Sequence, residues 1–189
     1  MGEAALKKHY TIEEYLELQS QVDYKIAYHD GEIYDMAGGS VNHARLSAKV
    51  GSLLDQALKN RNCAVFSADL MIGYNEKNYV YADASVICGK PETHKENKNA
   101  VKNPCLIVEV LSDETAEYDR GEKFKKYQQM TTFVEYVLIS QHKVWVEVFF
   151  KPPNVDFWQY RSYNTLEEKI QLRSLDLELS MQELYEGVF

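Results

Sequence analysis

Two acidic side chains occur within apolar runs of the sequence. The run CLIVEVL places Glu109 among side chains that are apolar on both faces of a strand, and YVYADASVIC places Asp83 in a second apolar run 26 residues earlier (109 − 83 = 26). A buried carboxylate is costly unless it is neutralised, paired or bound to a metal ion. Each of these two carboxylates therefore needs a chemical reason.

One such reason is a divalent cation held between them. If the two runs form neighbouring strands, Asp83 and Glu109 converge at one edge of a sheet, where like charges repel unless a cation lies between them. Carboxylate oxygens suit Mg²⁺ or Mn²⁺, which take one or two carboxylates together with waters and substrate phosphates. The alternative is structural: a glutamate at the C-terminal end of a strand can leave the sheet and pair with a lysine or arginine.

A helix predicted just after Glu109 adds further polar side chains. Asp119, Lys123 and Tyr127 follow one another at four-residue intervals, so they share one helix face. Because this helix begins a few residues after Glu109, that face is expected to turn back towards the end of the strand and to bring Lys123 near the metal and a bound phosphate. The alternative is an exposed Asp–Lys pair, which contributes only about 0.3–0.5 kcal/mol.

The elements that must position these residues follow from turn signals and periodicity. Thr11 and Glu14 form a capping-box pattern, and Asp30-Gly31 is a strong hairpin signal. An amphipathic helix is predicted from Val41 to about Lys59. The other predicted elements are strands in CAVFSADLMIGY, YVYADASVIC, CLIVEVLS, FVEYVLIS and KVWVEVFF and near 155–160, an exposed loop over 89–103, a helix over about 116–130, and a closing helix in SMQELYEG.

This order of elements predicts one domain over residues 1–189. Its fold class is α/β or α+β, with a mixed central β-sheet flanked by helices, a crossover helix after Glu109 and additional antiparallel strands. The net charge of −8 argues against binding nucleic acid through bulk electrostatics, although a bound cation reverses the field at one site.

Cysteine usage and hydropathy predict the compartment. Cys63, Cys88 and Cys105 show neither a CxxC motif nor a zinc-ligand spacing, and they are expected to be buried, reduced thiols. No apolar run approaches the ~20 residues that span a bilayer, and the N-terminus MGEAALKKHY lacks the apolar stretch of a signal peptide. A cytoplasmic protein without membrane contact is expected.

The segment LIVEVLSDETAEYDRGEKFKKY, taken with YADASVIC and HDGEIYDMAGGSVNH, resembles the bacterial Uma-type family of putative restriction endonucleases. That family is a branch of the PD-(D/E)XK nuclease superfamily. The resemblance runs from Thr11 to about Val188. It implies a restriction-endonuclease-like fold with a four-stranded mixed core sheet, and Mg²⁺-dependent (or Mn²⁺-dependent) endonuclease cleavage of DNA phosphodiesters.

The resemblance also implies roles for individual residues. Asp83 matches the aspartate of the PD motif and Glu109 the acidic residue of the (D/E)XK motif; both would bind the metal, together with the carbonyl of Val110. Ala82 replaces the proline of the motif, which is not a ligand. Leu111 stands where the superfamily has its catalytic lysine.

Three further positions bear on activity. Lys123 is the candidate replacement for the missing strand lysine, and it would position the attacking water or balance charge. Asp119 would orient Lys123 or contact the metal site. Many relatives have a glutamate where this chain has Ala27, and if that glutamate completes the metal site, activity here is weakened.

Auxiliary roles are implied for two more residues. His43, after the GGS break, would face the cleft; alternatively it only serves the start of its helix. Asp69 in FSADLMI matches a family aspartate; alternatively it has a strand-end or turn role. Glu32 is expected to serve the hairpin alone.

Two functions remain open from the sequence. The first is a DNA endonuclease, and the second is a catalytically weak or inactive nucleic-acid-binding or assembly module, which Ala27 and Leu111 favour. A homodimer is expected, since cutting both strands of a duplex suits two sites related by a two-fold axis. The apolar residues of KVWVEVFFKPPNVDFWQY would form its interface or belong to the core.

Overall fold

A six-stranded mixed sheet forms the centre of the molecule. The computed structural model describes residues 9–35 and 39–189. The strand order is β11-β10-β9-β8-β6-β3. These strands are β3 (Cys63–Ser67), β6 (Ala84–Cys88), β8 (Leu106–Leu111), β9 (Glu135–Ser140), β10 (Val146–Phe150) and β11 (Gln159–Tyr163).

The central pair of this sheet is parallel and the other pairs are antiparallel. Strands β8 and β9 run in the same direction, with Glu109 paired to Leu138. A parallel pair needs a crossover connection. Here the crossover consists of α3 (Ala116–Tyr118), a π-helical turn η1 (Asp119–Lys123) and α4 (Phe124–Tyr127). The predicted mixed sheet with a crossover helix after Glu109 is therefore confirmed.

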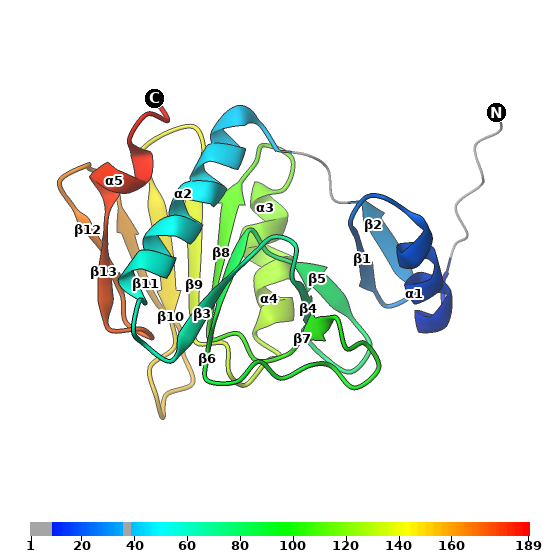
Figure 1. Cartoon of the computed structure of the whole chain (residues 1–189). Helices are drawn as coiled ribbons and strands as arrows, with labels where there is room; N and C mark the ends of the chain where they lie inside the picture. The colour runs from blue at the N-terminus through cyan, green and yellow to red at the C-terminus, as the bar shows by residue number, and fades with distance from the viewer. Residues whose placement is uncertain (1–8, 36–38) are drawn as a thin grey trace.

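Helices cover both faces of this sheet. On one face, α2 (Val41–Ala57) packs through Leu46, Val50 and Leu54, and α5 (Met181–Tyr185) lies beside it (Figure 1). On the opposite face, Phe124 and Tyr127 of the crossover pack against Tyr136 and its neighbours. Because all six residues of β8 are buried, a charged side chain on this strand has no direct way out to solvent.

A second, smaller sheet lies at the N-terminal end of the fold, to the right in Figure 1. Its strand order is β2-β1-β5-β4-β7. The preceding helix α1 (Ile12–Gln21) has the predicted capping box at Thr11, and Tyr15 donates a hydrogen bond to the carbonyl of Ile26 (3.0 Å). The strands are β1 (Ile26–His29), β2 (Glu32–Asp35), β4 (Met71–Gly73), β5 (Tyr79–Tyr81) and β7 (Ala100–Val101).

The hairpin at Asp30-Gly31 is confirmed. Both residues have a positive φ, 47° and 91°, which is the backbone conformation that two-residue hairpin loops require. The ladder of the hairpin pairs His29 with Glu32. Met36 and Ala37, which end the predicted second strand, lie outside the described residues.

Several predicted boundaries were wrong. The loop over 89–103 contains β7, which pairs in parallel with β4, and an isolated bridge joins Thr93 to Val101. The runs CAVFSADLMIGY and YVYADASVIC each break into two strands that enter different sheets. The helix after Glu109 ends at Tyr127. The hairpin of β12 (Lys169–Leu172) and β13 (Leu177–Ser180) was not predicted.

The prediction of three buried, reduced cysteines was also wrong. Cys63 and Cys88 are directly opposite each other in the β3–β6 ladder and form a disulfide, and only Cys105 is a free thiol. Cys88 is exposed, while Cys63 and Cys105 are half-buried. The sequence does not disclose this pairing because it depends on the register between two strands that are 25 residues apart. None of the described helices is long and apolar enough to cross a membrane.

Candidate active site

The β6–β8 ladder brings Asp83 and Glu109 together. Its register pairs Ala84 with Val108, so extending it by one residue places Asp83 opposite Glu109. Asp83 lies in the bend just before β6, and its Oδ2 accepts a hydrogen bond from the backbone N–H of Val110 (2.7 Å). The two acidic residues therefore lie opposite each other on adjoining strands, and the backbone N–H of Val110 holds the carboxylate of Asp83 in place.

Glu109 is a buried carboxylate with two donors on one oxygen. Its side chain is 4% exposed, and its Oε1 accepts hydrogen bonds from Lys123 Nζ (2.8 Å) and from the hydroxyl of Tyr127 (2.7 Å). Burial raises the pKa of Glu109 to about 8 although the charge of Lys123 opposes this change, and the nearby charges of Asp119 and Asp83 raise it further. Glu109 therefore holds a proton more tightly than an ordinary glutamate.

Lys123 joins Glu109 to Asp119. Its Nζ lies 3.4 Å from Asp119 Oδ1, and both side chains are almost fully buried. Burial acts to lower the pKa of Lys123, but attraction by Glu109 and Asp119 outweighs it, so the net pKa is raised. The ammonium group is therefore charged at neutral pH. The alternative of an exposed Asp–Lys pair is wrong. Glu109 does pair with a lysine, but it does so within the core and does not leave the sheet.

The π-helical turn over Asp119–Lys123 sets the orientation of this face. Such turns are rare, and they are often found at functional sites. The hydroxyl of Thr115 donates a hydrogen bond to Asp119 Oδ2 (2.7 Å), and the hydroxyl of Tyr136 donates to the backbone carbonyl of Asp119 (3.0 Å). Both ends of Asp119 are thereby fixed, and Lys123 faces the sheet.

His43 connects α2 to the same cluster. Its backbone N–H bonds to the N-cap side chain of Ser40 (3.1 Å), and its Nε2 lies 3.4 Å from Asp83 Oδ2. The hydrogen bond with Asp83 raises the pKa of His43 against the effect of burial, and the charges of Asp83 and Glu109 act in the same direction. His43 thus serves the start of its helix and also faces the carboxylates.

Other predicted positions lie apart from the cluster. Asp69 is 81% exposed and forms an ion pair with Lys25 (2.6 Å), which agrees with a turn role. Glu32 accepts a hydrogen bond from the hydroxyl of Tyr34 within the hairpin. Leu111 is 4% exposed and packs in the core beside the crossover helix.

Tyr127 was placed on the correct helix face by its spacing but was given no role. Its hydroxyl reaches Glu109 and, at 3.4 Å, the carbonyl of Tyr81. Tyr81 ends β5, two residues before Asp83. The only sequence signal for this contact is the four-residue interval after Lys123.

The free oxygens of the two carboxylates suit a hard divalent cation. Lys123 and Tyr127 both bind Oε1 of Glu109, and Val110 and His43 both contact Oδ2 of Asp83. No described hydrogen bond or ion pair reaches Oε2 of Glu109 or Oδ1 of Asp83. The described residues contain no group of three or more His, Cys, Asp and Glu side chains arranged to hold a metal. Two carboxylates completed by waters and phosphate fit Mg²⁺.

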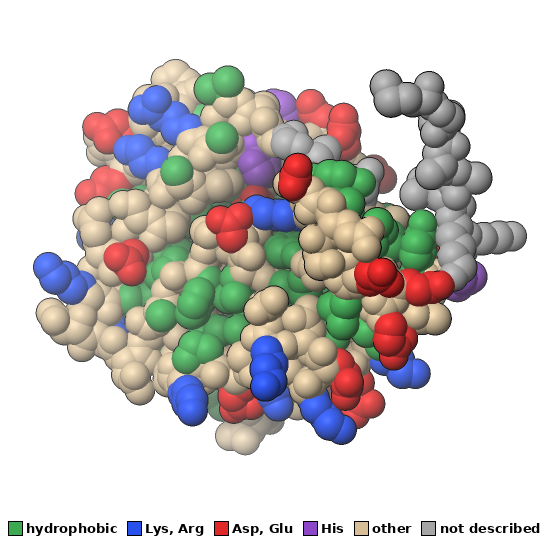
Figure 2. Space-filling model, turned by 45° about the vertical axis from the view of Figure 1, so that its right-hand side comes forward, with side chains coloured by type: hydrophobic (Ala, Val, Ile, Leu, Met, Phe, Trp, Pro, Cys, Tyr) green, Lys and Arg blue, Asp and Glu red, His purple; other side chains and the backbone are tan. Residues whose placement is uncertain are grey.

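A groove leads from solvent to Asp83. It has a volume of about 410 Å³ and lies between α2 and β3. Its walls include Ser47, Ala48 and Gly51 of the helix and Val65 of the strand. Figure 2 shows one face of the molecule, on which hydrophobic side chains gather in the middle and basic and acidic side chains alternate around them.

The mixed sheet, with Asp83 and Glu109 opposite each other on the neighbouring strands β6 and β8, defines a restriction-endonuclease-like fold. The fold is similar to that of a solved structure, a putative nuclease belonging to DUF820 from Anabaena variabilis. The TM-score is 0.76 with 16% sequence identity, and the likeness covers 95% of this chain and 99% of that chain. At this identity the likeness concerns the fold.

The chain belongs to the Uma2 family, whose description is "putative restriction endonuclease" and whose profile matches residues 12–182. Two relatives from a Synechocystis strain have names that state no activity. Uncharacterized protein slr1290 is 33% identical over 177 residues, covering 93% of this chain and 91% of the relative. Uncharacterized protein sll1609 is 36% identical over 148 residues, covering 78% of this chain and 84% of the relative.

Proposed function

We propose that this protein is a metal-dependent endonuclease that hydrolyses DNA phosphodiester bonds. The observation that carries the proposal is the arrangement at the end of β8: Glu109 is bound by Lys123, and Asp83 is held opposite it by the backbone of Val110. Membership of a nuclease family adds independent support.

Asp83 and Glu109 would hold Mg²⁺ or Mn²⁺ through their free oxygens, together with the carbonyl of Val110. A bound ion of this kind lowers the pKa of a water ligand and neutralises charge on the phosphate. Lys123 is held 2.8 Å from Glu109, and its ammonium group balances negative charge that develops on the phosphate. Tyr127 fixes Oε1 of Glu109, which leaves the second oxygen for the ion.

His43 and Asp119 would position other side chains of the site, Asp83 and Lys123 respectively, and would not contact the phosphate. His43 contacts the same Asp83 oxygen that binds Val110 N–H, so it limits rotation of that carboxylate. Asp119 is anchored by Thr115 and lies 3.4 Å from Lys123 Nζ, so it keeps the ammonium group on the sheet side of the helix.

A catalytically inactive nucleic-acid-binding module is the second candidate function. The observation that favours it is that Ala27 and Leu111 provide neither a third carboxylate nor a strand lysine, while Lys123 already occupies one oxygen of Glu109. An inactive module would bind nucleic acid equally well with and without a divalent ion.

The first experiment is a titration of Mn²⁺ into the pure protein by calorimetry. We expect binding to the wild type and its loss in Glu109→Ala. A matched control is Glu135→Gln, which removes another buried carboxylate at the opposite end of the β8–β9 pair. Binding that persists in Glu109→Ala, or that disappears equally in Glu135→Gln, would contradict the assignment.

Cleavage is then measured on duplex DNA, single-stranded DNA and RNA with Mg²⁺, with Mn²⁺ and with a chelator. Metal-dependent cleavage of DNA that is lost in Asp83→Asn and retained in Glu135→Gln supports the endonuclease. Metal-independent binding without cleavage on all three substrates supports the inactive module.

A homodimer would supply the second site for cutting both strands. The apolar residues predicted for its interface divide between two environments. Val146 and Val148 of β10 are core residues, whereas Phe157 and Tyr160 are 56% and 52% exposed near edge strand β11. Light scattering on Tyr160→Glu and on the wild type tests this surface, and an unchanged mass would exclude this surface from the interface.

A further inference from the structure

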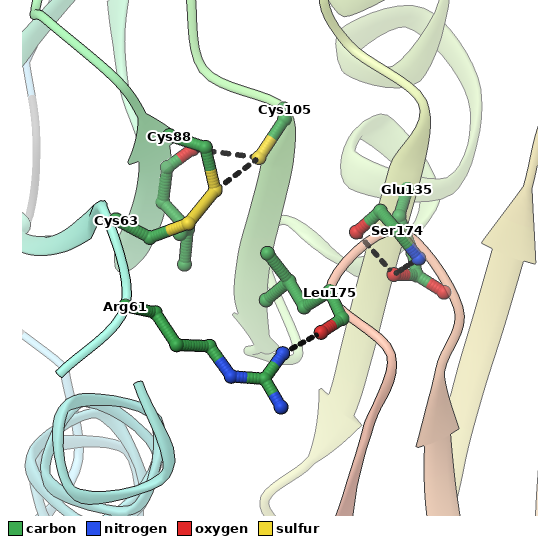
Figure 3. The surroundings of a disulfide bond; sticks show 8 residues. Arg61, Cys63, Cys88, Cys105, Glu135, Ser174 and Leu175 are labelled. Carbon is green, nitrogen blue, oxygen red and sulfur yellow. Dashed lines mark hydrogen bonds between the residues drawn. A yellow bond between two sulfur atoms is a disulfide. The ribbon is translucent and has the colours of Figure 1, made fainter. Parts of the chain in front are cut away.

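Three sulfur atoms lie in a row beside the edge of the central sheet. Cys63 of β3 and Cys88 of β6 form a disulfide, and the free thiol of Cys105 lies 3.9 Å from the sulfur of Cys88 (Figure 3). Cys105 immediately precedes β8, so the three cysteines come from three neighbouring segments in the order β3, β6, β8.

The backbone holds Cys105 at this position. Its N–H donates a hydrogen bond to the carbonyl of Val86 (2.9 Å), and its thiol points to the same carbonyl (3.4 Å). Val86 pairs with Leu106, so Cys105 lies one step beyond the end of the ladder and beside the last residues of β6. The approach of the Cys105 sulfur to Cys88 is therefore determined by strand pairing.

We propose that Cys105 and the Cys63–Cys88 disulfide form an internal thiol–disulfide exchange site. The thiolate of Cys105 attacks the sulfur of Cys88, and a Cys88–Cys105 bond forms as the Cys63–Cys88 bond breaks. The electron pair of the broken bond passes to Cys63, which takes up a proton as a free thiol. The exchange consumes no oxidant or reductant, because one disulfide and one thiol are present before and after it.

The direction of attack follows from the distance. Among the described contacts, Cys88 is the disulfide sulfur within reach of Cys105, so Cys63 is the leaving group. Burial raises the pKa of the Cys105 thiol, which keeps it protonated at neutral pH and makes exchange faster in alkaline solution. The negative charge of Glu135 acts in the same direction, and hydrogen bonds to nearby backbone groups oppose both effects.

The exchange moves a covalent bond from one strand pair to the next. Before exchange the disulfide joins β3, the edge strand, to β6. After exchange it joins the end of β6 to the residue just before β8, and the ladder of these two strands also brings Asp83 and Glu109 together. The edge strand then carries a free, half-buried thiol at Cys63.

The test traps the thiol that the exchange releases. The oxidised, folded wild type is incubated with iodoacetamide at about pH 8.5, where thiolate is present. It is then quenched with acid and digested with pepsin, and the alkylated and disulfide-linked peptides are mapped by mass spectrometry. We expect alkylated Cys63 together with a Cys88–Cys105 disulfide. The proposal fails if alkylation is confined to Cys105 with Cys63–Cys88 intact, or if all three cysteines are alkylated from the start.

Single substitutions separate exchange from simple exposure. In Cys105→Ser the attacking sulfur is absent, so the Cys63–Cys88 disulfide should persist with complete loss of Cys63 alkylation. In Cys63→Ser, glutathione disulfide should oxidise the remaining pair to Cys88–Cys105, whereas Cys88→Ser should give no internal disulfide. Mixed disulfides with glutathione on Cys88 in place of the internal bond would overturn the proposal. None of these readouts depends on nuclease activity.

Discussion

Lys123 Nζ and Glu109 Oε1 lie 2.8 Å apart within the core, with side chains 7% and 4% exposed, and they form an ion pair where Glu109 is ionised. Removing one partner of such a pair leaves an uncompensated charge. Because the ammonium group is held by two carboxylates, Glu109 and Asp119, it is the charge on which the geometry of the cluster depends.

Lys123→Met should lower the free energy of unfolding by about 3 kcal/mol at alkaline pH, and by less at acidic pH, where Glu109 is protonated and needs no partner. Urea unfolding at the two pH values measures the difference. Lys125→Met, two residues along and exposed, is the control and should change stability by no more than about 0.5 kcal/mol. Equal losses in the two variants would argue against a buried pair.

Measurements of cleavage and of metal binding together distinguish the role of Lys123 from that of Asp83. If Lys123 balances charge on the phosphate, Lys123→Ala loses cleavage as Asp83→Asn does, while Mn²⁺ still binds to the lysine variant. The rate of cleavage and calorimetry on each variant provide the two readouts. Full cleavage by Lys123→Ala alongside an inactive Asp83→Asn would remove the lysine from the mechanism.

The stability of the fold should depend on pH through Glu109. Its pKa is about 8 in the folded protein and 4.5 ordinarily, so the folded state binds this proton more tightly. Its contribution to stability is fully present below about pH 4.5 and is lost as the pH rises to about 8. We expect the stability of the wild type relative to Glu109→Gln to fall by a few kcal/mol over this interval, as measured by urea unfolding.

The pH dependence caused by Glu109 must be distinguished from that of other groups with shifted pKa values. His43 also has a raised pKa and loses its contribution as the pH rises; its main cause, the hydrogen bond with Asp83, is present in both proteins compared, whereas the smaller effect of the Glu109 charge is not. Glu178→Gln is the matched control, since the pKa of Glu178 is lowered by Gln171 and then Lys169, and its contribution changes below about pH 4.5. A constant difference between wild type and Glu109→Gln over the interval would show that Glu109 ionises normally.

Metal binding should release a proton from Glu109. Since this carboxylate holds its proton up to about pH 8, the affinity for Mn²⁺ should rise by up to about tenfold for each pH step of one between 6 and 8. Calorimetry in buffers of different ionisation enthalpy counts the protons released. Binding at pH 6 without proton release would place the ion elsewhere.

Ala27→Glu should strengthen the metal site. Ala27 lies in β1, whose register with β5 places it opposite Val80, three residues before Asp83. Val80 belongs to the core cluster that also contains Leu111 and Tyr127. We expect the variant to bind Mn²⁺ more tightly and to cleave faster, with Ala27→Gln as the uncharged control. An increase that the glutamine variant reproduces would exclude metal ligation as its cause.

Much of the candidate site was predictable because its parts are local. Glu109 stands out within an apolar strand, and Asp119, Lys123 and Tyr127 share a face through simple helical spacing. The contact between His43 and Asp83 was less accessible, because it depends on how α2 lies across the sheet. The exposure of Asp69 agrees with the strand-end or turn role that its sequence context offered as an alternative, since β3 ends at Ser67.

The π-helical turn and the disulfide have no sequence signature of their own. The turn over Asp119–Lys123 is wider by one residue than an α-helical turn, and such turns are rare. The bond between Cys63 and Cys88 requires the exact register of β3 on β6. Both are results of tertiary packing, which periodicity along the chain does not specify.

The donor of the hydrogen bond from Val110 to Asp83 is the backbone N–H, so this contact does not depend on the identity of the side chain at position 110. Any residue except proline has the same N–H. The side chain is restricted separately, because Val110 is buried in the core and a polar or charged replacement there would be costly. An apolar replacement would therefore keep the hydrogen bond that holds Asp83, whereas a proline would remove it.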